Sequence, residues 1–472
     1  MACGEARITG KPGVCLSTEG PGALNLVNGV ADAYRDGVPM LIITGQVETG
    51  KLSTGAKQYF DQQQLFAPIT GQTTLLTRPE SVVGTLRVAM EKAAGDSTPC
   101  HVSIPKDIFL SPAKFLVSSP GTPRPPGISG SVENVLSVMA GCRRPLILTG
   151  KAALPHREAV IELAERIGAG IIAAQGAGGI CPAASRLIPG GLGEAHIPPI
   201  LGRADCVFLI GSSPYEQRFI PPGIRVVQID ICPQKLFHQL RPISLTGDVA
   251  AILASLLEGL TGAVPDVSWQ EEIKRGRESH LSIIREEAHL SGSPVSPRQT
   301  VALLNDIIPE DAFISVDTGE FMHWFDRGFI ARRQQVIISD YWRCMGGGLP
   351  MGLGAQAAAS GKKVVVLAGD GGFIMSMQEI ITAVRYSLPV AVIIFNNGRY
   401  LLEEHRMQKA GMLPFGVDVS APDFASVATA CGAGGIRVEY SEELREALIK
   451  AIEADGPWVV DIQTAAERPL FI

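Results

Sequence analysis

The chain has 472 residues, 46% of them hydrophobic and 19% charged, which is enough for about three domains with cores of their own. The net charge of −6 and the lack of any Lys/Arg run disfavour a nucleic-acid or anionic-membrane partner, and nine scattered cysteines disfavour a disulfide frame or zinc site. No apolar run approaches the ~20 residues of a membrane span and the start lacks a signal-peptide core, so a cytoplasmic location is expected.

The first part of the chain alternates between strand and helix patterns. A strand is expected at 13–18, a turn at 19–22, a helix at 23–36 that Gly37 stops, and a strand at 39–44. A linker with four prolines and three glycines follows at 116–130. These patterns predict a first α/β domain at 1–115.

A second α/β domain is predicted at 131–262. Its expected strands are 145–150, 170–174, 206–211 and 225–230, and its expected helices are 156–167 and 248–260. A charged helical stretch at 268–290 and a Ser/Gly/Pro joint at 291–297 then lead to the last part of the chain.

A third α/β domain is predicted at 295–472. Helices are expected at 298–307, 321–329, 423–431 and 442–454, and strands at 312–317, 335–339, 362–368, 389–395, 435–438 and 458–462. Alternating strands and helices imply parallel sheets with helices on both faces, so the fold class is α/β with three doubly wound domains.

Two polar turns follow neighbouring apolar strands in this third domain. Gly369-Asp370-Gly371-Gly372 follows the strand at 362–368, and Asn396-Asn397-Gly398-Arg399 follows the strand at 389–395. Glycines let backbone N–H groups approach a diphosphate, and Asp and Asn offer the hard oxygen ligands that Mg²⁺ prefers. Two ordinary turns that end two strands are the alternative. Ligands bind at the carboxyl ends of such strands, which favours a site here.

The pair of turns resembles the thiamine-diphosphate (ThDP) signature, and the whole chain resembles the acetolactate synthase/pyruvate oxidase family. Other similar segments are Arg7 to Val14 (RITGKPGV), Glu19 to Asn25 (EGPGALN), Ile43 to Val47 (ITGQV), Val227 to Pro233 (VQIDICP) and Met345 to Pro350 (MGGGLP). The resemblance implies a pyrimidine-binding domain, a middle domain that often binds flavin, and a diphosphate-binding domain. It also implies active sites between the subunits of a homodimer or larger homo-oligomer.

The resemblance assigns roles to residues at the signature. Asp370, the side-chain oxygen of Asn397 and the backbone carbonyl of Arg399 would bind Mg²⁺. The N–H groups of Gly371 and Gly372, and those of the Thr318-Gly319-Glu320 turn after the strand at 312–317, would hold the diphosphate. The remaining cofactor-binding residues implied by the resemblance are Pro21, Gly22, Gly369 and Tyr400.

Three further residues would act at the reactive end of the cofactor. Met345 would wedge between the two rings of ThDP and enforce its bent conformer, and the carbonyl of Arg343 would accept a hydrogen bond from the 4′-amine. Gln46 ends a strand, and its amide would either face the substrate or make a loop hydrogen bond.

The chain departs from the family in three places. The family's activating glutamate would fall before Met1, as would about the first strand, helix and strand of the first domain, so that domain is expected to be incomplete. Glu5 is expected to be a solvated helix charge rather than a substitute. Lys57-Gln58-Tyr59 replaces the common Phe-Gln-Glu of the substrate loop, and Arg218 is shifted from the flavin-binding arginine, which leaves FAD open.

The resemblance implies a ThDP- and magnesium-dependent decarboxylation of a 2-oxo acid, with pyruvate as the expected substrate, followed by transfer of the acyl unit as in acetolactate synthase. A pyruvate-oxidase-like enzyme linked to FAD is one alternative. A non-catalytic ThDP-binding partner subunit is the other.

Overall fold

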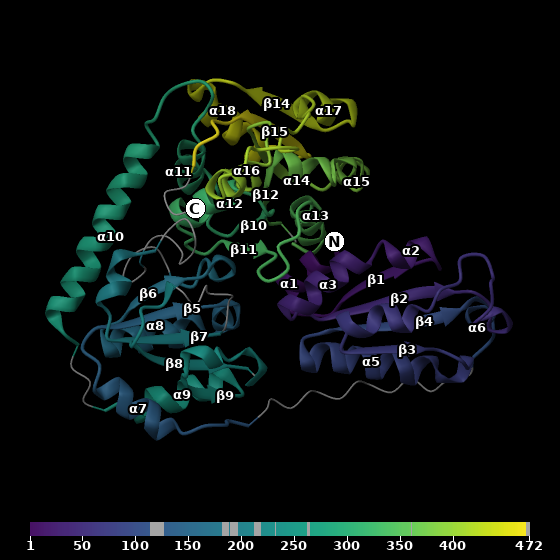
Figure 1. Ribbon diagram of the computed structural model, residues 1–472, viewed down its shortest axis with the longest axis horizontal. Helices are drawn as coiled ribbons and strands as arrows, with labels where there is room; N and C mark the ends of the chain where they lie inside the picture. The colour runs from purple at the N-terminus through teal and green to yellow at the C-terminus, as the bar shows by residue number, and fades with distance from the viewer. Residues whose placement is uncertain are drawn as a thin grey trace.

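A computed structural model describes residues 1–113, 127–181, 188, 197–211, 219–231, 233–261, 265–359 and 361–468. It contains three parallel sheets, one in each domain, with helices against them (Figure 1). The predicted fold class is therefore confirmed: three α/β domains follow one another along the chain. Within the described residues, their sheets have four, five and six strands.

The first domain has the strand order β1-β2-β4-β3, with β1 at the edge. Its predicted helix 23–36 is split in two, because the Leu26 N–H bonds the carbonyl of Ala23 three residues back and tightens the turn. The elements are α1 (Ala2–Thr9), β1 (Gly13–Ser17), α2 (Pro21–Leu24), α3 (Val27–Asp36), β2 (Met40–Gln46), α4 (Gln62–Phe66), β3 (Gln72–Leu75), α5 (Val82–Asp96), β4 (Pro99–Pro105) and α6 (Lys106–Phe109).

The middle domain has the order β6-β5-β7-β8-β9. The four predicted strands are present, and the short strand β9 at its edge and the helix α7 were not predicted. The elements are α7 (Val132–Ala140), β5 (Pro145–Thr149), α8 (Arg157–Ile167), β6 (Gly170–Ala173), β7 (Cys206–Ile210), β8 (Arg225–Asp230), β9 (Ile243–Thr246), α9 (Val249–Gly259) and the connecting helix α10 (Val267–Glu287).

The third domain has the order β11-β10-β12-β13-β15-β14. Its elements are α11 (Pro297–Ile307), β10 (Phe313–Val316), α12 (Phe321–Gly328), β11 (Gln335–Ile338), α13 (Gly348–Ala358), β12 (Val364–Gly369), α14 (Asp370–Ile374), α15 (Ile380–Arg385), β13 (Ala391–Asn396), α16 (Leu401–Lys409), α17 (Phe424–Ala430), β14 (Gly434–Val438), α18 (Ser441–Glu453) and β15 (Trp458–Gln463). All six strands run parallel, as expected.

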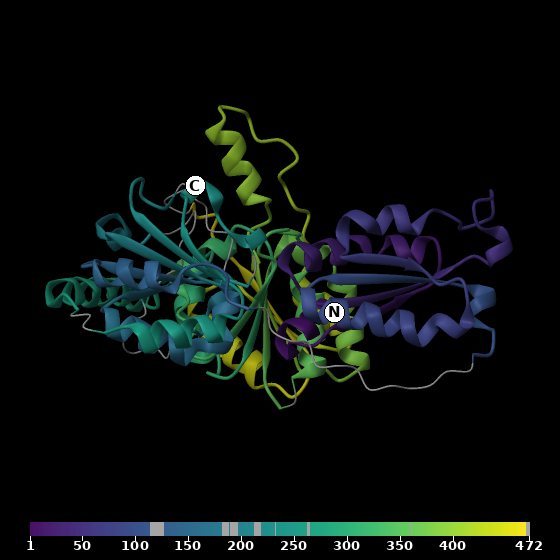
Figure 2. The same ribbon diagram turned by 90° about the horizontal axis from the view of Figure 1, so that it is seen from below.

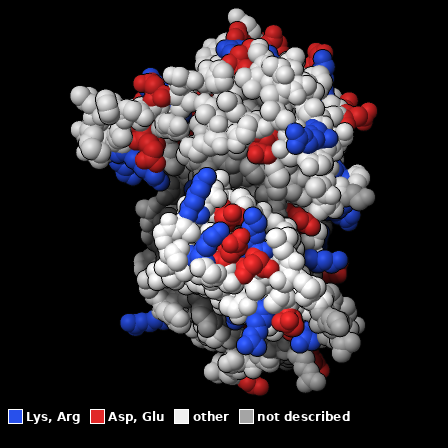
Figure 3. Space-filling view, turned by 90° about the vertical axis from the view of Figure 1, so that its right-hand side faces the viewer, with Lys and Arg blue, Asp and Glu red and all other residues white. Residues whose placement is uncertain are grey.

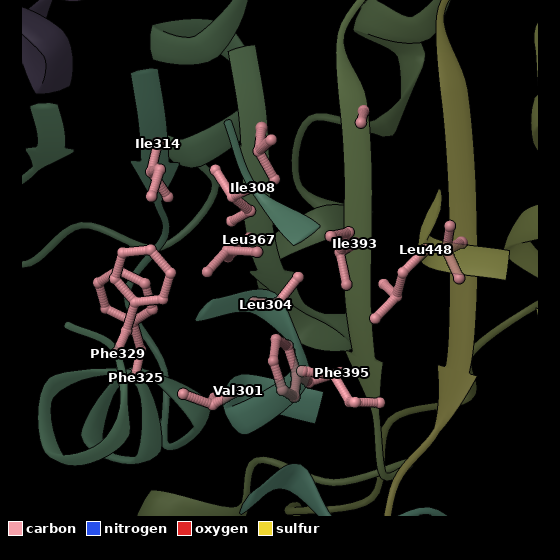
Figure 4. Packing of buried hydrophobic residues seen from close by; sticks show 14 of the residues in the cluster. Val301, Leu304, Ile308, Ile314, Phe325, Phe329, Leu367, Ile393, Phe395 and Leu448 are labelled. Carbon is pink, nitrogen blue, oxygen red and sulfur yellow. The ribbon is translucent and has the colours of Figure 1, made fainter. Parts of the chain in front are cut away.

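Both faces of the third sheet are buried. Alternate residues of the central strands point to opposite faces, and Figure 4 shows Leu367 and Ile393 beside Leu304 of α11 and Phe325 of α12 on one of them. Burying each such side chain stabilises the fold by about 1.5–3 kcal/mol. Runs of Val, Ile and Leu in β12 and β13 are therefore sufficient to fix these strands at the centre of the sheet.

The first and third domains are in contact through α1 and α13 (Figure 1). Glycines make this crossing close: a Cβ on Gly4 would lie 2.1 Å from the carbonyl oxygen of Met351, and one on Gly354 would lie 2.0 Å from that of Met1. The backbones of the two helices therefore touch directly.

The visible surface mixes charges of both signs. On the face shown in Figure 3, Lys/Arg and Asp/Glu side chains are interspersed, without a continuous basic field. None of the helices in the described part of the chain combines the length and apolar character needed to cross a bilayer.

A buried histidine in the first domain should make stability sensitive to acid. The ring nitrogens of His101 lie 2.8 Å from the Thr44 hydroxyl and 2.7 Å from the Thr73 hydroxyl, and the ring stacks on Phe66. Burial lowers the pKa of His101 from 6.5 to about 4. Between these values the unfolded chain binds a proton that the folded protein does not, so stability should fall as the pH decreases from 6.5 to 4.

We expect the urea midpoint of the wild type to drop between pH 7 and pH 5, with this group contributing at most about 2 kcal/mol over that range. His101→Gln should lose part of that dependence, whereas His289→Gln at an exposed position should keep it. Equal slopes in wild type and His101→Gln would contradict the assignment.

Candidate cofactor and metal site

The order in which strands are added to the third sheet reverses at the predicted site. The chain passes from β10 outward to β11, then returns to β12 and β13 on the other side of β10, so the carboxyl ends of β10 and β12 form a topological switch point. Doubly wound sheets bind ligands at such points. The turns after these four strands carry the residues predicted for the diphosphate, the metal and the bent cofactor.

The two halves of the signature meet directly. The Asp370 carboxylate accepts hydrogen bonds from the N–H groups of Gly371 (2.7 Å) and of Gly398 (2.6 Å). Asn397 uses its side-chain oxygen to accept from the Arg399 N–H at 3.0 Å. Residues that are 28 positions apart therefore form one oxygen-rich turn at adjoining strand ends.

Burial raises the pKa of Asp370 to about 6, against the hydrogen bonds that Gly371 and Gly398 donate to it. A buried carboxylate of this kind is favoured in its charged form by a cation. The Arg399 side chain does not supply that charge at the turn, because its guanidinium pairs with Glu404 at 2.8 Å. The charge balance of the turn fits a bound divalent ion.

At Gly371 and Gly372 a side chain would collide with a neighbouring residue. A Cβ on Gly371 would lie 2.4 Å from the ring of Tyr400, and a Cβ on Gly372 would lie 2.5 Å from a carboxylate oxygen of Asp317. The ring of Tyr400 thus lines the turn. Gly369, the last residue of β12, is the N-cap of α14.

Two of the predicted diphosphate donors are engaged elsewhere. The Gly371 N–H donates to Asp370, and the Thr318 N–H donates to Asp317 at 2.8 Å. These carboxylates adjoin their donors in sequence, which favours the local bonds. Among the hydrogen bonds of the described residues, none uses the N–H groups of Gly319 or Gly372. These two amides are better placed as donors to an anion.

Polar atoms without partners also lie in this region. The Thr318 hydroxyl and one carboxyl oxygen of Glu320 are buried, and neither has a hydrogen-bond partner in the described part of the chain. Burial raises the pKa of Glu320 to about 8, so it is neutral at pH 7 and does not repel an anion. The turn can therefore accept a negatively charged ligand.

Asp317 is a site residue that the sequence reasoning missed. Its carboxylate is buried, accepts from the Gly346 N–H at 3.0 Å, and lies against Gly372 and the backbone of Gly348. Its place directly after an apolar strand was the available signal. Asp317 thereby joins the switch point to the glycine turn that carries Met345.

Arg343 and Met345 lie in the segment between β11 and α13, residues 339–346, which we name the Met345 turn. Arg343 has a positive φ of 56°, its N–H donates to the Ser339 hydroxyl at 2.8 Å, and its guanidinium donates to the Asp340 carbonyl at 2.9 Å. A non-glycine residue with positive φ is held there only by its surroundings. The turn is thus fixed in one conformation.

The predicted site residues of the first domain are Pro21, Gly22 and Gln46. Within the described part of the chain, no hydrogen bond or ion pair connects them to the diphosphate edge of the third sheet. Pro21 and Gly22 begin α2. The Gln46 side chain donates to the Phe60 carbonyl at 3.1 Å and accepts from the Val47 N–H at 2.9 Å, which favours the loop hydrogen bond over a contact with substrate. Glu5 is exposed on α1, as expected for a solvated charge.

The residues present fit a magnesium diphosphate. The described part of the chain holds no cluster of three His, Cys, Asp or Glu residues suited to a metal, and the expected ligand set instead combines Asp370 with amide and carbonyl oxygens. Mg²⁺ bound to a diphosphate needs only one or two carboxylates.

Arg218, on which the flavin prediction depends, lies outside the described residues.

Comparisons with known proteins support this reading. Residues 1–65, 132–256 and 317–462 match the N-terminal TPP binding domain, the central domain and the C-terminal TPP binding domain of thiamine pyrophosphate enzymes. The chain is 31% identical to "Putative thiamine pyrophosphate-containing protein YdaP" of Bacillus subtilis, over 99% of this chain and 83% of that protein.

Two other relatives have names that state a reaction. The catabolic acetolactate synthase of Raoultella terrigena is 31% identical over 98% of this chain and 85% of its own length. "Probable 2-ketoarginine decarboxylase AruI" of Pseudomonas aeruginosa is 29% identical over 99% of this chain and 86% of its own length. The chain is thus similar to proteins whose names state different reactions.

Proposed function

Since this chain belongs to the thiamine-diphosphate-dependent enzyme family that includes acetolactate synthase, we propose that it decarboxylates a 2-oxo acid, with pyruvate as the substrate to test, and transfers the acyl unit to a second 2-oxo acid. The observation that carries the proposal is the contact between Asp370 and the Asn397-Gly398 turn at the switch point. It joins a carboxylate, an amide oxygen and glycine N–H groups where a magnesium diphosphate fits.

Each part of the site has a separate task in this proposal. Asp370, Asn397 and the Arg399 carbonyl hold Mg²⁺. The Thr318 hydroxyl and the N–H groups of Gly319 and Gly372 hold the diphosphate, while the Glu320 carboxyl stays neutral.

Met345 and the Arg343 carbonyl orient the other end of the cofactor. When bound, thiamine diphosphate supplies the carbon nucleophile and the electron sink for decarboxylation. The protein contributes position, charge and exclusion of water.

We propose a homodimer as the smallest active form. In the described residues, no hydrogen bond joins Pro21 or Gly22 to the diphosphate edge, so a second subunit would supply them. Apolar side chains are available for an interface: Leu413 is 91% exposed and Phe415 87% exposed beyond α16, which projects from the body of the molecule (Figure 2). Sedimentation that shows a stable ThDP-loaded monomer would contradict this.

A non-catalytic ThDP-binding subunit is the second candidate. It is favoured by the exposure of Glu5 and by the use of the Glu19 carboxylate, which accepts from the Thr18 hydroxyl at 2.6 Å. The Thr18 hydroxyl holds the pKa of Glu19 below its ordinary value, so this carboxyl is ionised at pH 7 and does not donate a hydrogen bond. This candidate predicts cofactor binding without turnover.

One experiment separates the candidates. Purified protein is incubated anaerobically with pyruvate, ThDP and Mg²⁺, its visible absorption is recorded, and CO₂, acetolactate and acetate are measured. Acetolactate and CO₂ support the carboligase, whereas acetate formation that reduces a bound flavin and bleaches its visible absorption supports the pyruvate-oxidase alternative. Binding of ThDP without any product supports the non-catalytic subunit.

Glu320 should make cofactor binding depend on pH. Because burial raises the pKa of Glu320 to about 8, its carboxyl loses a proton between pH 7 and pH 9 and then places a negative charge near the diphosphate. The affinity of the wild type for Mg²⁺-ThDP should fall severalfold over this range. Glu320→Gln remains neutral and should lose that dependence. Parallel pH profiles for the wild type and Glu320→Gln would contradict the position of the Glu320 carboxyl beside the diphosphate.

A further inference from the structure

Helix α3 of the first domain holds the Met345 turn of the third domain. The Asp36 carboxylate accepts from the N–H groups of Asp340 and Tyr341, each at 2.9 Å, although the partners are 304 and 305 positions away. The Asp36 side chain is fully buried. A buried carboxylate that accepts two successive backbone N–H groups fixes both the position and the direction of the chain there.

A second residue of α3 holds the middle of the same turn. The side-chain oxygen of Asn28 accepts from the Trp342 indole at 2.7 Å, and its amide donates to the Cys344 sulfur at 2.8 Å. The Cys344 thiol in turn donates to the Met345 carbonyl at 3.1 Å. Hydrogen bonds from this one helix therefore reach four of the five residues from Asp340 to Cys344, all but Arg343.

Cations from the first and middle domains lie beside the Asp36 carboxylate. Arg7 of α1 lies 2.7 Å from its carboxylate, and Lys151 of the middle domain lies 3.7 Å from it and 2.6 Å from Asp340. Arg7 also pairs with Asp32 at 3.0 Å. These cations outweigh the cost of burying the Asp36 carboxylate and hold its pKa below the ordinary value, so it remains a charged acceptor.

We propose that Asp36 and Asn28 are positioning residues that set the Met345 turn for the bent cofactor. The inference rests on the proposed function, in which Met345 and the Arg343 carbonyl contact the cofactor rings. A turn with a positive φ at Arg343 needs external restraints, and α3 supplies them. The ring end of the site is thereby set by the first domain of the same chain, while the metal end is built wholly within the third domain.

The test compares two ligands and two buried aspartates. Asp36→Asn removes an acceptor of the turn, whereas the control Asp32→Asn also removes a carboxylate from Arg7 but leaves the turn bonds intact. Calorimetry is run with Mg²⁺-ThDP and with Mg²⁺-pyrophosphate, which cannot reach Met345. We expect Asp36→Asn to weaken ThDP binding about tenfold, the equivalent of one lost hydrogen bond, with pyrophosphate binding unchanged.

Asn28, which is exposed, provides a second variant if Asp36→Asn does not fold. Asn28→Leu should weaken ThDP but not pyrophosphate binding, and Asn28→Asp, which keeps the acceptor for Trp342, should recover part of the loss. Equal weakening of both ligands, or wild-type affinity for ThDP in Asp36→Asn and Asn28→Leu, would overturn the proposal.

Hydrogen exchange in the cofactor-free protein separates this inference from the proposed function. Asp36→Asn should speed exchange of the Asp340 and Tyr341 amides, whereas Asp32→Asn should not. A wild type that binds pyrophosphate but not ThDP would refute the proposed function. Unchanged exchange in Asp36→Asn would refute the positioning role whatever the cofactor.

Discussion

Asp370→Ala is expected to abolish measurable binding of Mg²⁺-ThDP, with a loss of at least about 100-fold in affinity. The variant removes the one carboxylate of the expected metal ligand set and the acceptor that ties Gly398 to the start of α14. Equilibrium dialysis with labelled ThDP at fixed Mg²⁺ measures the change. Because burial raises the pKa of Asp370 to about 6, binding by the wild type should also weaken as the pH falls below that value.

Two controls make the result specific. Asp455→Ala removes an exposed carboxylate of the same domain and should bind as the wild type does. Asp370→Asn keeps an oxygen that can accept from Gly398, so it should fold normally and bind with intermediate affinity. Wild-type affinity in Asp370→Ala would show that the cofactor is held elsewhere.

Gly4→Ala is expected to destabilise the protein by about 3 kcal/mol or more, beyond the usual cost of overpacking a core. The new Cβ would lie 2.1 Å from the Met351 carbonyl oxygen, and neither partner is a flexible side-chain end. Helix α1 would have to move away from α13, which separates the first domain from the third. The unfolding midpoint in urea and the protease sensitivity of the chain report the change.

The matched control is Gly84→Ala in α5, where the added Cβ meets nothing within 4 Å. This substitution should stabilise the helix by about 0.5–1 kcal/mol because alanine restricts the unfolded chain and favours helix. If both variants shift the midpoint in the same direction, the close crossing of α1 and α13 is not a determinant of stability.

The parts of the site that the sequence predicts are those encoded locally. The runs that form β12 and β13 are too apolar to lie anywhere but between two helix layers, so the residues after them had to fall at one edge of the sheet. The contact between Asp370 and the Asn397-Gly398 turn confirms that the two halves of the signature meet.

The parts that the sequence could not predict depend on tertiary contacts. Asp317 ends a strand as many aspartates do, and only the folded chain brings the Gly346 N–H to it from 29 positions away. Asp36 reads as an ordinary residue at a helix end, yet two backbone N–H groups of a different domain donate to it. The use of the Gly371 N–H by Asp370 likewise depends on a local geometry that no pattern specifies.

The most direct measurement is a calorimetric titration of the wild-type protein with ThDP, with and without Mg²⁺. We predict saturable binding of one ThDP per chain that requires the metal and is reversed by a chelator. Absence of binding, or binding of equal strength after the metal has been removed, would contradict it.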